Sequence, residues 1–499
     1  MSAASGWPSL VAARAAFASG ELLPSELLAA CRARIAAHNP QLNALVTLDL
    51  AAAGAAAVAA DRAYVAAGAL TQGGAAGDLP PLLGLPFSLK DSFATVDLRT
   101  TAGHPPLSLH YPAQDASVVA RLRAAGGILV GKSNLAELAG DPQCWNPLFG
   151  PTGNPWGAGL TPGGSSGGSA VAVAMGFSLL DLGSDIGGSI RIPAAYCGVA
   201  GFKASENRIP RSGHIPQLPG QPRTVRHLLS FGALARSCAD LALALPLLCG
   251  PDGLDSEVPP LPWRAVPPPV QPLRLAYWGE WPGLPLCPRT RQGLAQAVAS
   301  LRAQGQRVEE VAPPWPLAEA WRLWGEIAGS EIGATAPAGE RGLMRLLATF
   351  LPRRGGPLAA FVRGFGARHA SYARALAARE AMIAAFEQLL AGFDALLCPV
   401  AALAPYPAFR AARWRPPPKV VLGGESVGWA EAAVGCCLPF SLTGSPVLSL
   451  PAAVVEGLPV GLQLVGRRWQ DEALLALGAV VESLLWPAGL PYPPLAGAG

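Results

Sequence analysis

The chain has 499 residues, 51% of them apolar, so it can bury a large core in one or two domains. Its formal net charge of +4, with arginines scattered along the sequence, is too small to indicate a nucleic-acid partner. The apolar stretches are shorter than the ~20 residues of a membrane span. Residues 1–20 lack the pattern of a secretion signal, so we expect a cytoplasmic protein that does not enter a membrane.

The first third of the chain alternates predicted helices with short apolar strands. Apolar residues at helical spacing predict helices or helical turns over 25–37, 51–67, 117–125 and 134–139. Short apolar runs predict strands over 82–90 and 128–130. The first of these strands ends at Lys90, and the alternation indicates an α/β core.

The rest of the chain continues this pattern around a proline-rich connection at 259–269, which cannot form a helix interior or a central strand. We expect a loop over 160–168 and helices over 169–177, 193–201, 237–248, 289–304 and 471–485, with a mostly helical stretch from 313 to 391. Strands are expected over 179–182, 273–278, 395–399 and 447–451.

Cysteine and histidine spacing indicates no metal site. The nine cysteines have no CxxC pattern, and the six histidines have no HExxH or HxH pattern. An odd number of cysteines leaves at least one thiol unpaired, so we expect reduced, buried thiols in a cytoplasmic protein. We therefore expect neither a metal nor another cofactor.

One segment, Gly126 to Ser133, matches the phosphate-loop pattern GxxxxGK[ST]. A true phosphate loop follows a strand and precedes a helix, and its intervening residues curl around phosphate. Here a predicted helix precedes Gly126, and the intervening residues are themselves the predicted strand 128–130. A nucleotide-binding protein therefore stays an alternative that the local context disfavours.

Two glycine-serine segments dominate the sequence, 163–169 (GGSSGGS) and 183–191 (GSDIGGSIR). The first matches in part the nucleophile elbow GxSxG, which would make Ser165 or Ser166 the nucleophile of an α/β-hydrolase. An elbow needs an apolar strand directly before it, but residues 154–162 are rich in turn formers. A flexible linker also fits poorly, because the two segments enclose a predicted helix and strand.

These segments, together with several others, resemble the amidase signature family. The matching stretches are 84–91 (GLPFSLKD), 131–134 (GKSN), 149–156 (FGPTGNPW), 162–170 (PGGSSGGSA), 183–194 (GSDIGGSIRIPA), 197–203 (CGVAGFK), 442–451 (LTGSPVLSLP) and 457–466 (GLPVGLQLVG). The resemblance covers nearly the whole chain except about 250–390. One departure is GFKAS at 201–205, where many relatives read GLKPT, and it bears on substrate preference more than on catalysis.

The resemblance implies an α/β fold in which one large amidase domain, residues 1–499, contains a central mixed β-sheet covered by helices on both faces. Residues 60–240 and 393–485 would form the catalytic core. Residues 250–392 would form a variable, mostly helical region around the substrate pocket.

The family's catalytic triad is a lysine, a serine in a cis peptide and a serine nucleophile, and these positions fall on Lys90, Ser165 and Ser189. A serine hydroxyl needs a base, and a lysine can act as one only as a neutral amine, which burial favours. In the implied mechanism Lys90 takes the proton of Ser165, Ser165 takes that of Ser189, and Ser189 attacks the carbonyl. Ser165 then protonates the leaving nitrogen, and water hydrolyses the acyl-enzyme.

The resemblance also assigns supporting roles to the two glycine-serine segments. The backbone N–H groups that would form an oxyanion hole are those of Ile186, Gly187, Gly188 and Ser189. The side chains that would support the catalytic groups are Ser166, Asp185 and Arg191.

We expect a hydrolase of small-molecule amides, with esters and carbamates as further substrates because they present the same carbonyl. The loop residues expected to contact the substrate are Gly140, Asp141, Cys144 and Trp145. The tryptophans that could line the pocket are Trp315, Trp321, Trp324, Trp414 and Trp429. A homodimer is compatible with the sequence.

The family also includes the amidase subunit of a transfer-RNA-dependent amidotransferase, which works inside an assembly. The weak net charge and the absence of a recognisable RNA-binding motif favour a free-standing hydrolase without a nucleic-acid partner. The amidotransferase subunit stays the second alternative.

Overall fold

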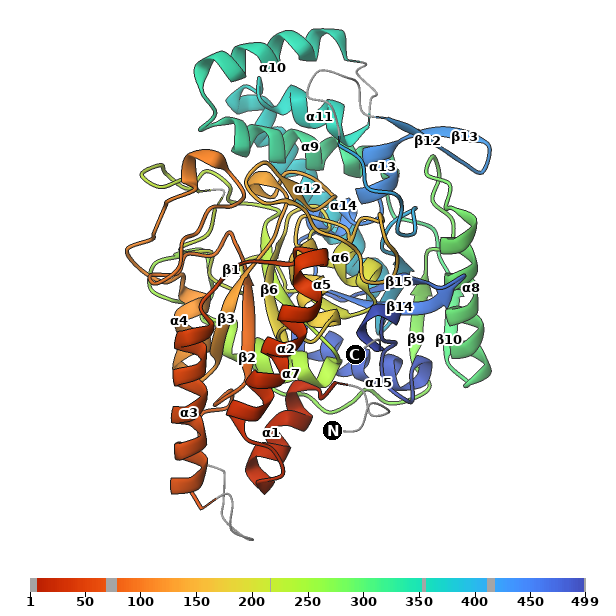
Figure 1. The fold of residues 1–499 in the computed structure, drawn as a ribbon. Helices are drawn as coiled ribbons and strands as arrows, with labels where there is room; N and C mark the ends of the chain where they lie inside the picture. Colours follow the sequence, from red (N-terminus) through yellow and green to blue (C-terminus); the bar gives the residue numbers. More distant parts are fainter. Residues whose placement is uncertain (1–6, 69–78, 216, 352–355, 411–417, 498–499) are drawn as a thin grey trace.

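A mixed β-sheet forms the centre of the molecule (Figure 1). The computed structural model describes residues 7–68, 79–215, 217–351, 356–410 and 418–497. The strands of the central sheet are β1 Leu45–Leu48, β2 Pro86–Lys90, β3 Ile128–Ser133, β6 Leu180–Asp185, β7 Ala200–Lys203, β8 Ser230–Ala235, β9 Arg274–Tyr277, β10 Arg307–Glu310, β11 Ala395–Pro399, β14 Val447–Val455 and β15 Leu458–Val465. Two hairpins outside it are β4 Trp145–Asn146 with β5 Gly150–Pro151 and β12 Lys419–Leu422 with β13 Glu425–Gly428.

The eleven strands lie in the order β1-β3-β2-β6-β8-β7-β14-β15-β11-β9-β10. Strands β3, β2 and β6 run parallel, as do β11, β9 and β10, and the other neighbouring pairs are antiparallel. Since β2 and β6 are adjacent and parallel, their carboxyl ends meet at one edge of the sheet, where α/β proteins place their ligands. Lys90 and Asp185 are the last residues of these two strands.

Helices cover both faces of the sheet. They are α1 Leu10–Ser19, α2 Pro24–Leu42, α3 Leu50–Ala66, α4 Ser117–Ala124, α5 Gly167–Ala174, α6 Arg191–Cys197, α7 Cys238–Leu248, α8 Pro288–Ala303, α9 Leu317–Gly333, α10 Ala338–Phe350, α11 Pro357–Gly364, α12 His369–Leu390, α13 Trp429–Val434, α14 Leu438–Leu442 and α15 Asp471–Leu485. Helices α6 and α8 lie on opposite faces of the sheet. Two successive residues of β15 show this, because Gly461 packs against Ala195 of α6 and Val460 packs against Gly293 of α8. The expected single domain, with a mixed sheet between two helical layers, is confirmed.

Each face has its own apolar core. Residues of α2, α3, α5 and α6 pack together on one face, while α1, α4, α7, α8 and α15 contribute to the larger core of the other. The side chains of β2 point alternately toward the two faces of the sheet, as successive side chains of a strand do. Phe87 and Leu89 belong to the larger core, so Ser88 and Lys90 face α5. A buried polar layer therefore lies between β2 and α5.

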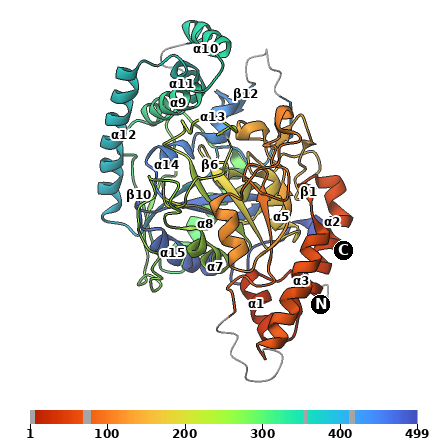
Figure 2. The same cartoon turned by 90° about the vertical axis from the view of Figure 1, so that its left-hand side faces the viewer.

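Helices α9, α10 and α11 lie at the top of Figure 1 and again at the top of the turned view in Figure 2, where α12 runs down one side of the molecule. Helix α11 packs along α9, and α9 also contacts α14 and α12. The segment 250–392 is not only helical, because its strands β9 and β10 extend the central sheet. In the ranges that the structure describes, no helix is long and apolar enough to cross a bilayer.

Most predicted elements are present, with boundaries shifted by a few residues. The strand predicted at 128–130 continues to Ser133 as β3, and the helix predicted at 193–201 is α6, which ends at Cys197. The helical turns predicted at 134–139 were wrong in extent, because only a short 3₁₀ turn, Glu137–Ala139, forms there. Strands that the sequence pattern missed in the central sheet are β1, β7, β8, β10 and β15.

Candidate active site

Lys90, at the end of β2, lies in a buried cluster of hydroxyl groups. Its Nζ donates to Ser165 Oγ at 2.6 Å and to Ser184 Oγ at 3.0 Å, with the Ser184 carbonyl oxygen at 3.4 Å. The Lys90 side chain is completely excluded from solvent. The end of β2 therefore places the Lys90 amine within hydrogen-bond distance of the Ser165 hydroxyl in the first glycine-serine segment.

Burial lowers the pKa of the Lys90 amine from its usual value of 10.5 to about 7, because the charged form loses its hydration. Three groups oppose this shift, since their negative forms favour the ammonium ion: Asp185 most strongly, then Cys144 and Asp181. Near neutral pH a large fraction of the amine is consequently free to accept a proton.

The first glycine-serine segment is held tightly against the loop 141–144. The peptide bond between Gly164 and Ser165 is cis. A Cβ at Gly164 would overlap the carbonyl oxygens of Asp141 and Gln143, so only glycine fits there. Ser165 and Ser166 are buried directly before α5, and the N–H of Ser166 donates to the carbonyl oxygen of Ser189 at 3.2 Å. This bond joins the two segments.

Asp185 and Arg191 form a buried ion pair at the second glycine-serine segment. Arg191 Nη2 and Nε lie 2.8 and 3.0 Å from the two carboxylate oxygens of Asp185. Burial opposes ionisation of Asp185, but the guanidinium and the surrounding N–H donors outweigh it and hold the carboxyl pKa well below its usual range. Arg191 also donates to the Cys437 carbonyl and to Ser441 Oγ, at 2.9 and 2.8 Å. The pair thereby anchors this segment to α14.

The same carboxylate shapes the turn around Ser189. The N–H groups of Gly188 and Ile190 donate to the two oxygens of Asp185 at 2.7 and 3.0 Å. Gly188 has a φ of +117°, a conformation that residues with a side chain rarely adopt. Ser189 is half-buried. Within the described residues its hydroxyl makes no hydrogen bond, so the structure brings Lys90 and Ser165 together but shows no bond between Ser165 and Ser189.

The family profile described as Amidase matches residues 26–475 of this sequence. The chain belongs to the amidase family. Its curated relatives include two proteins named as the A subunit of glutamyl-tRNA(Gln) amidotransferase. The one from Roseiflexus sp. (strain RS-1) is 34% identical, over 97% of this chain and 98% of the relative. The one from Thermus thermophilus is 35% identical, over 96% and 98%.

A solved structure described as a crystal structure of amidase also matches this amidase-family chain. It shares 32% sequence identity and a TM-score of 0.75, and the alignment covers 96% of this chain and all of the other. Similarity in both sequence and fold over nearly the full length supports an amidase signature hydrolase that acts on C–N bonds.

In this amidase fold, apolar side chains surround the turn before Ser189. Trp324 of α9 donates its indole N–H to the Ile186 carbonyl oxygen at 2.8 Å, and its ring faces Gly187 together with Leu438. Cys437 packs against Gly188. Of the four tryptophans among those considered from the sequence that the structure describes, Trp324 contacts this turn. Sequence reasoning missed Cys437 and Leu438, and no motif around them signals their position.

The other tryptophans have different surroundings. Trp315 packs edge-to-face against Trp278 and Phe386 in the core, and Trp321 donates its indole N–H to the Gly435 carbonyl oxygen at 3.0 Å. Trp429 packs against Tyr406 and Phe409. Trp414 lies outside the described residues.

The four loop residues expected to contact substrate differ in position and exposure, and among them Asp141 approaches the cis peptide through its carbonyl oxygen. Gly140 is exposed, and Asp141 is half-buried with Oδ1 accepting from the Gln143 N–H at 2.7 Å. Trp145 is half-buried under the Arg410 guanidinium, which is 4.4 Å from the ring centroid. Cys144 is only 2% exposed and packs against Gly167, so its thiol supports α5 from beneath.

The phosphate-loop motif does not form a loop. Gly131, Lys132 and Ser133 continue β3, and the Lys132 side chain is fully buried. Its Nζ donates to the Phe93 carbonyl at 2.6 Å and lies 3.5 Å from Asp91 Oδ1. Lys132 is therefore a structural cation and is not available to bind a nucleotide.

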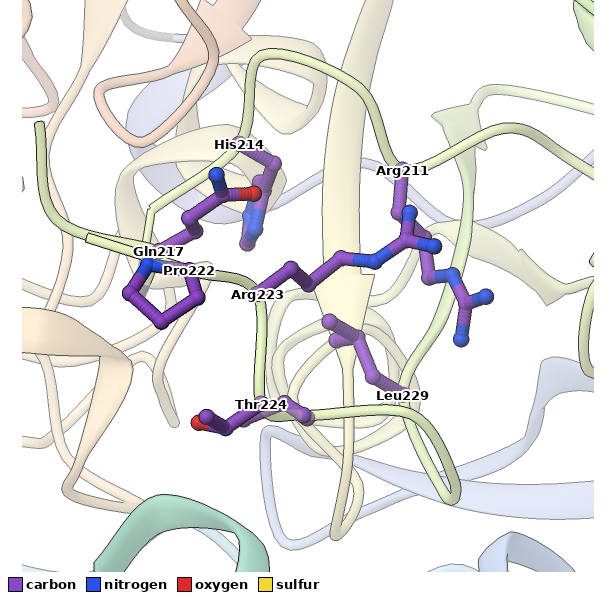
Figure 3. Close-up of a pocket in the computed structure, with 8 residues that line it drawn as sticks. Arg211, His214, Gln217, Pro222, Arg223, Thr224 and Leu229 are labelled. Carbon is purple, nitrogen blue, oxygen red and sulfur yellow. The ribbon is translucent and has the colours of Figure 1, made fainter. Parts of the chain in front are cut away.

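A separate small hollow lies beside the chain that follows β2. Figure 3 shows Arg211 and Arg223 side by side on one flank, with His214 and Gln217 on the other. His214 Nε2 is 2.9 Å from Ser92 Oγ, two residues after Lys90, while both arginines pair with Asp255. None of the three expected triad residues lines this hollow. Among the described residues, no cluster of His, Cys, Asp and Glu could hold a metal ion.

Proposed function

We propose that the protein is a serine hydrolase that cleaves the C–N bond of small-molecule amides through an acyl-enzyme, with Lys90, Ser165 and Ser189 as its catalytic triad. The 2.6 Å contact between Lys90 Nζ and Ser165 Oγ carries this proposal. A buried amine with a pKa of about 7, bonded to a serine hydroxyl, is equipped to act as a base at neutral pH.

In the proposed reaction Lys90 accepts the proton of Ser165 while Ser165 accepts that of Ser189. The Ser189 oxygen bonds to the carbonyl carbon, and the carbonyl π electrons move onto oxygen. Ser165 then gives a proton to the leaving nitrogen as the C–N bond breaks and takes one back from Lys90, which becomes neutral again. Water, deprotonated through the same two groups, releases the acid and regenerates Ser189.

Backbone N–H groups at the Ser189 turn would stabilise the oxyanion. The Gly188 N–H already donates to Asp185 Oδ1 and is not free to bind an oxyanion. Of the four residues expected from the sequence, the proposed donors are therefore Ile186, Gly187 and Ser189. Loss of one such donor typically raises the barrier by about 3 kcal/mol. The Asp185–Arg191 pair contributes indirectly, because it fixes the path of the backbone through these residues.

The apolar surroundings of the turn favour an apolar acyl group. Trp324 is half-buried and faces Gly187, so the acyl chain of a bound substrate would meet its ring, while the fully buried Leu438 and Cys437 keep the turn in apolar surroundings from behind. Esters and carbamates present the same carbonyl to the same groups and belong to the proposed substrate range.

A second candidate function is that of an amidotransferase component that releases ammonia from glutamine for a transfer-RNA-bound substrate. The names of the curated relatives support it, and it would require protein and nucleic-acid partners. An activity assay of the purified chain, with and without partner proteins, distinguishes the hydrolase from the amidotransferase component. The isolated chain should hydrolyse an apolar anilide by itself, whereas an amidotransferase component would release ammonia from glutamine only when its partner proteins are added.

Covalent labelling with a fluorophosphonate, mapped by mass spectrometry, tests the nucleophile. We expect a single adduct on Ser189 and none in the Ser189→Ala variant. Ser330→Ala is the matched control, because Ser330 is also a half-buried serine but donates to the Glu326 carbonyl within α9. An adduct on Ser165 or Ser166, or undiminished hydrolysis by Ser189→Ala, would contradict the proposal.

A further inference from the structure

A second buried carboxyl group, Asp181, lies on the same face of the sheet as Lys90. Asp181 is fully buried on β6, and its Cα is paired in register with that of Ser88 on β2. Ser88 donates to Asp181 Oδ2 at 2.6 Å. Lys90 is two residues beyond Ser88, and side chains two apart on a strand share a face. The next residue of β6 on this face is Gly183, which has no side chain to separate the two groups.

The surroundings of Asp181 are hydroxyl groups without a balancing cation. Ser88 Oγ is also 2.7 Å from Ser178 Oγ, and the neighbouring hydroxyls of Ser133 and Ser169 are 2.9 Å apart. The hydroxyls of Ser88, Ser169 and Ser133 act on the Asp181 carboxyl, but in the described part of the chain no arginine or lysine lies within ion-pair distance of it. A buried carboxylate left in this state is costly unless a nearby positive charge compensates it.

The titratable groups that act on Lys90 come from three directions. Asp185 and Asp181 lie on β6, Cys144 lies in the loop beneath α5, and His214 approaches from the far side of Ser92. Helix α5 itself contributes no titratable side chain. Asp185 is already paired with Arg191, and burial raises the pKa of the Cys144 thiol. Asp181 is therefore the carboxyl group near Lys90 whose charge is not already neutralised.

We propose that Asp181 is a positioning residue for catalysis, whose carboxylate compensates the positive charge that Lys90 acquires when it takes a proton. The inference rests on the proposed role of Lys90 as the base. No bond to Asp181 forms or breaks, because the proton moves from Ser165 Oγ to Lys90 Nζ and later returns. Burial raises the pKa of Asp181 to about 7, so the two groups titrate over the same pH range and influence each other.

The pH dependence of fluorophosphonate labelling tests this coupling without a known substrate. The second-order labelling rate of the full-length chain should rise with pH as Lys90 loses its proton. In Asp181→Asn the neutral amine is favoured, because the compensating negative charge is gone, so the rise should move to lower pH. If the apparent pKa of labelling falls by roughly half a unit, the variant should reach an about threefold higher fraction of its maximal rate at pH values below that pKa. Asparagine fits, since its amide can accept from Ser88 and donate to the Ser133 or Ser169 hydroxyl.

Asp240→Asn is the matched control. Asp240 is also buried, with a pKa raised to about 6 by desolvation, but its Oδ1 accepts from the Val11 N–H at the contact between α1 and α7. The pH profile of fluorophosphonate labelling for Asp240→Asn should coincide with that of the wild type. A second test variant, Ser88→Ala, removes the hydrogen bond that favours ionised Asp181 and should shift the profile in the same direction by a smaller amount.

The possible outcomes separate this inference from the proposed function. A wild-type rate that rises near pH 7 and is unshifted in both Asp181→Asn and Ser88→Ala would overturn the inference and leave Lys90 as the base. A uniform loss of rate at every pH would indicate a merely structural role for Asp181 and would also overturn it. A flat wild-type profile would contradict the proposed function itself.

Discussion

Replacement of Gly188 by alanine should destabilise the protein and disrupt its active site together. A Cβ at this position would lie 2.6 Å from Ile192 Cδ1 and 2.9 and 3.0 Å from Cys437 Sγ and Cβ. Overpacking of this kind typically costs about 1–3 kcal/mol. The φ of +117° adds on the order of 1–2 kcal/mol for a residue with a side chain. The expected loss of unfolding free energy is thus roughly 2–5 kcal/mol.

A matched substitution separates these two contributions. Gly457, in the turn between β14 and β15, also has a positive φ, +75°, but no heavy atom lies within 4 Å of a Cβ placed there. Gly457→Ala should therefore cost only the conformational part, about 1–2 kcal/mol, and leave the labelling rate of Ser189 unchanged. The difference between the two variants measures the steric contact with Ile192 and Cys437.

Urea unfolding and fluorophosphonate labelling of both variants provide the assay. Relief of the overlap at Gly188 requires the turn to move, and that movement displaces the N–H groups of Gly187 and Ser189, so we expect labelling of Gly188→Ala to slow by at least tenfold. Equal unfolding free energies for Gly188→Ala and Gly457→Ala, combined with an unchanged labelling rate, would refute the reasoning. The turn would then be more adaptable than its contacts indicate.

Three further predictions concern buried charges. Activity of the wild type should rise about tenfold between pH 6 and pH 8, because the neutral fraction of Lys90, whose pKa is about 7, grows by that factor; a flat profile from pH 5 to 9 would exclude Lys90 as the base. Asp185→Asn should lose roughly 3–5 kcal/mol of stability at pH 7, because Arg191 stays buried without its partner. Since folding depresses the pKa of Asp185 from its usual value of 3.8, its contribution is present above that pKa and is lost as the pH falls from there through the lower folded-state pKa. Urea melts at pH 7 and at about pH 3 should therefore show a smaller difference between wild type and variant at the lower pH, and a difference that grows on acidification would contradict the assignment. Finally, Mg-ATP should leave the thermal midpoint unchanged, because Lys132 is bound to Phe93 and Asp91 inside β3; stabilisation by Mg-ATP that Lys132→Met abolishes would restore the nucleotide-binding alternative.

The sequence predicted the parts of the site that are continuous in the chain. Lys90 was predicted at a strand end, and Asp185 and Arg191 were named as supporting residues from a motif of a few residues, whereas their ion pair is seen only in the structure. The contacts of Trp324 and Cys437 with that turn could not be predicted, because they join segments far apart in sequence; Trp324 and Ile186 are separated by 138 positions. Local patterns contain no information about which distant element will cover a turn.

Several strands escaped prediction for a related reason. Strands β7, β8 and β15 contain glycines at 201, 232 and 461, and glycine weakens the local signal for a strand. In the folded chain Gly201 and Gly461 let α6 approach the sheet, since a Cβ on either would overlap Ala194 or Ala195. The advantage of glycine at these positions comes from tertiary packing, which a window of neighbouring residues does not contain.

The hydrogen bond from Trp324 to the Ile186 carbonyl has a consequence for engineering. Helix α9 belongs to the segment in which the sequence motifs of the family were not found, and helices beside an active site are common targets for directed evolution of new substrate preferences. Here the same helix holds one of the peptide groups that would bind the oxyanion. Libraries that vary α9 should therefore keep Trp324 fixed, because a change of specificity obtained at this position would come with slower turnover for every substrate.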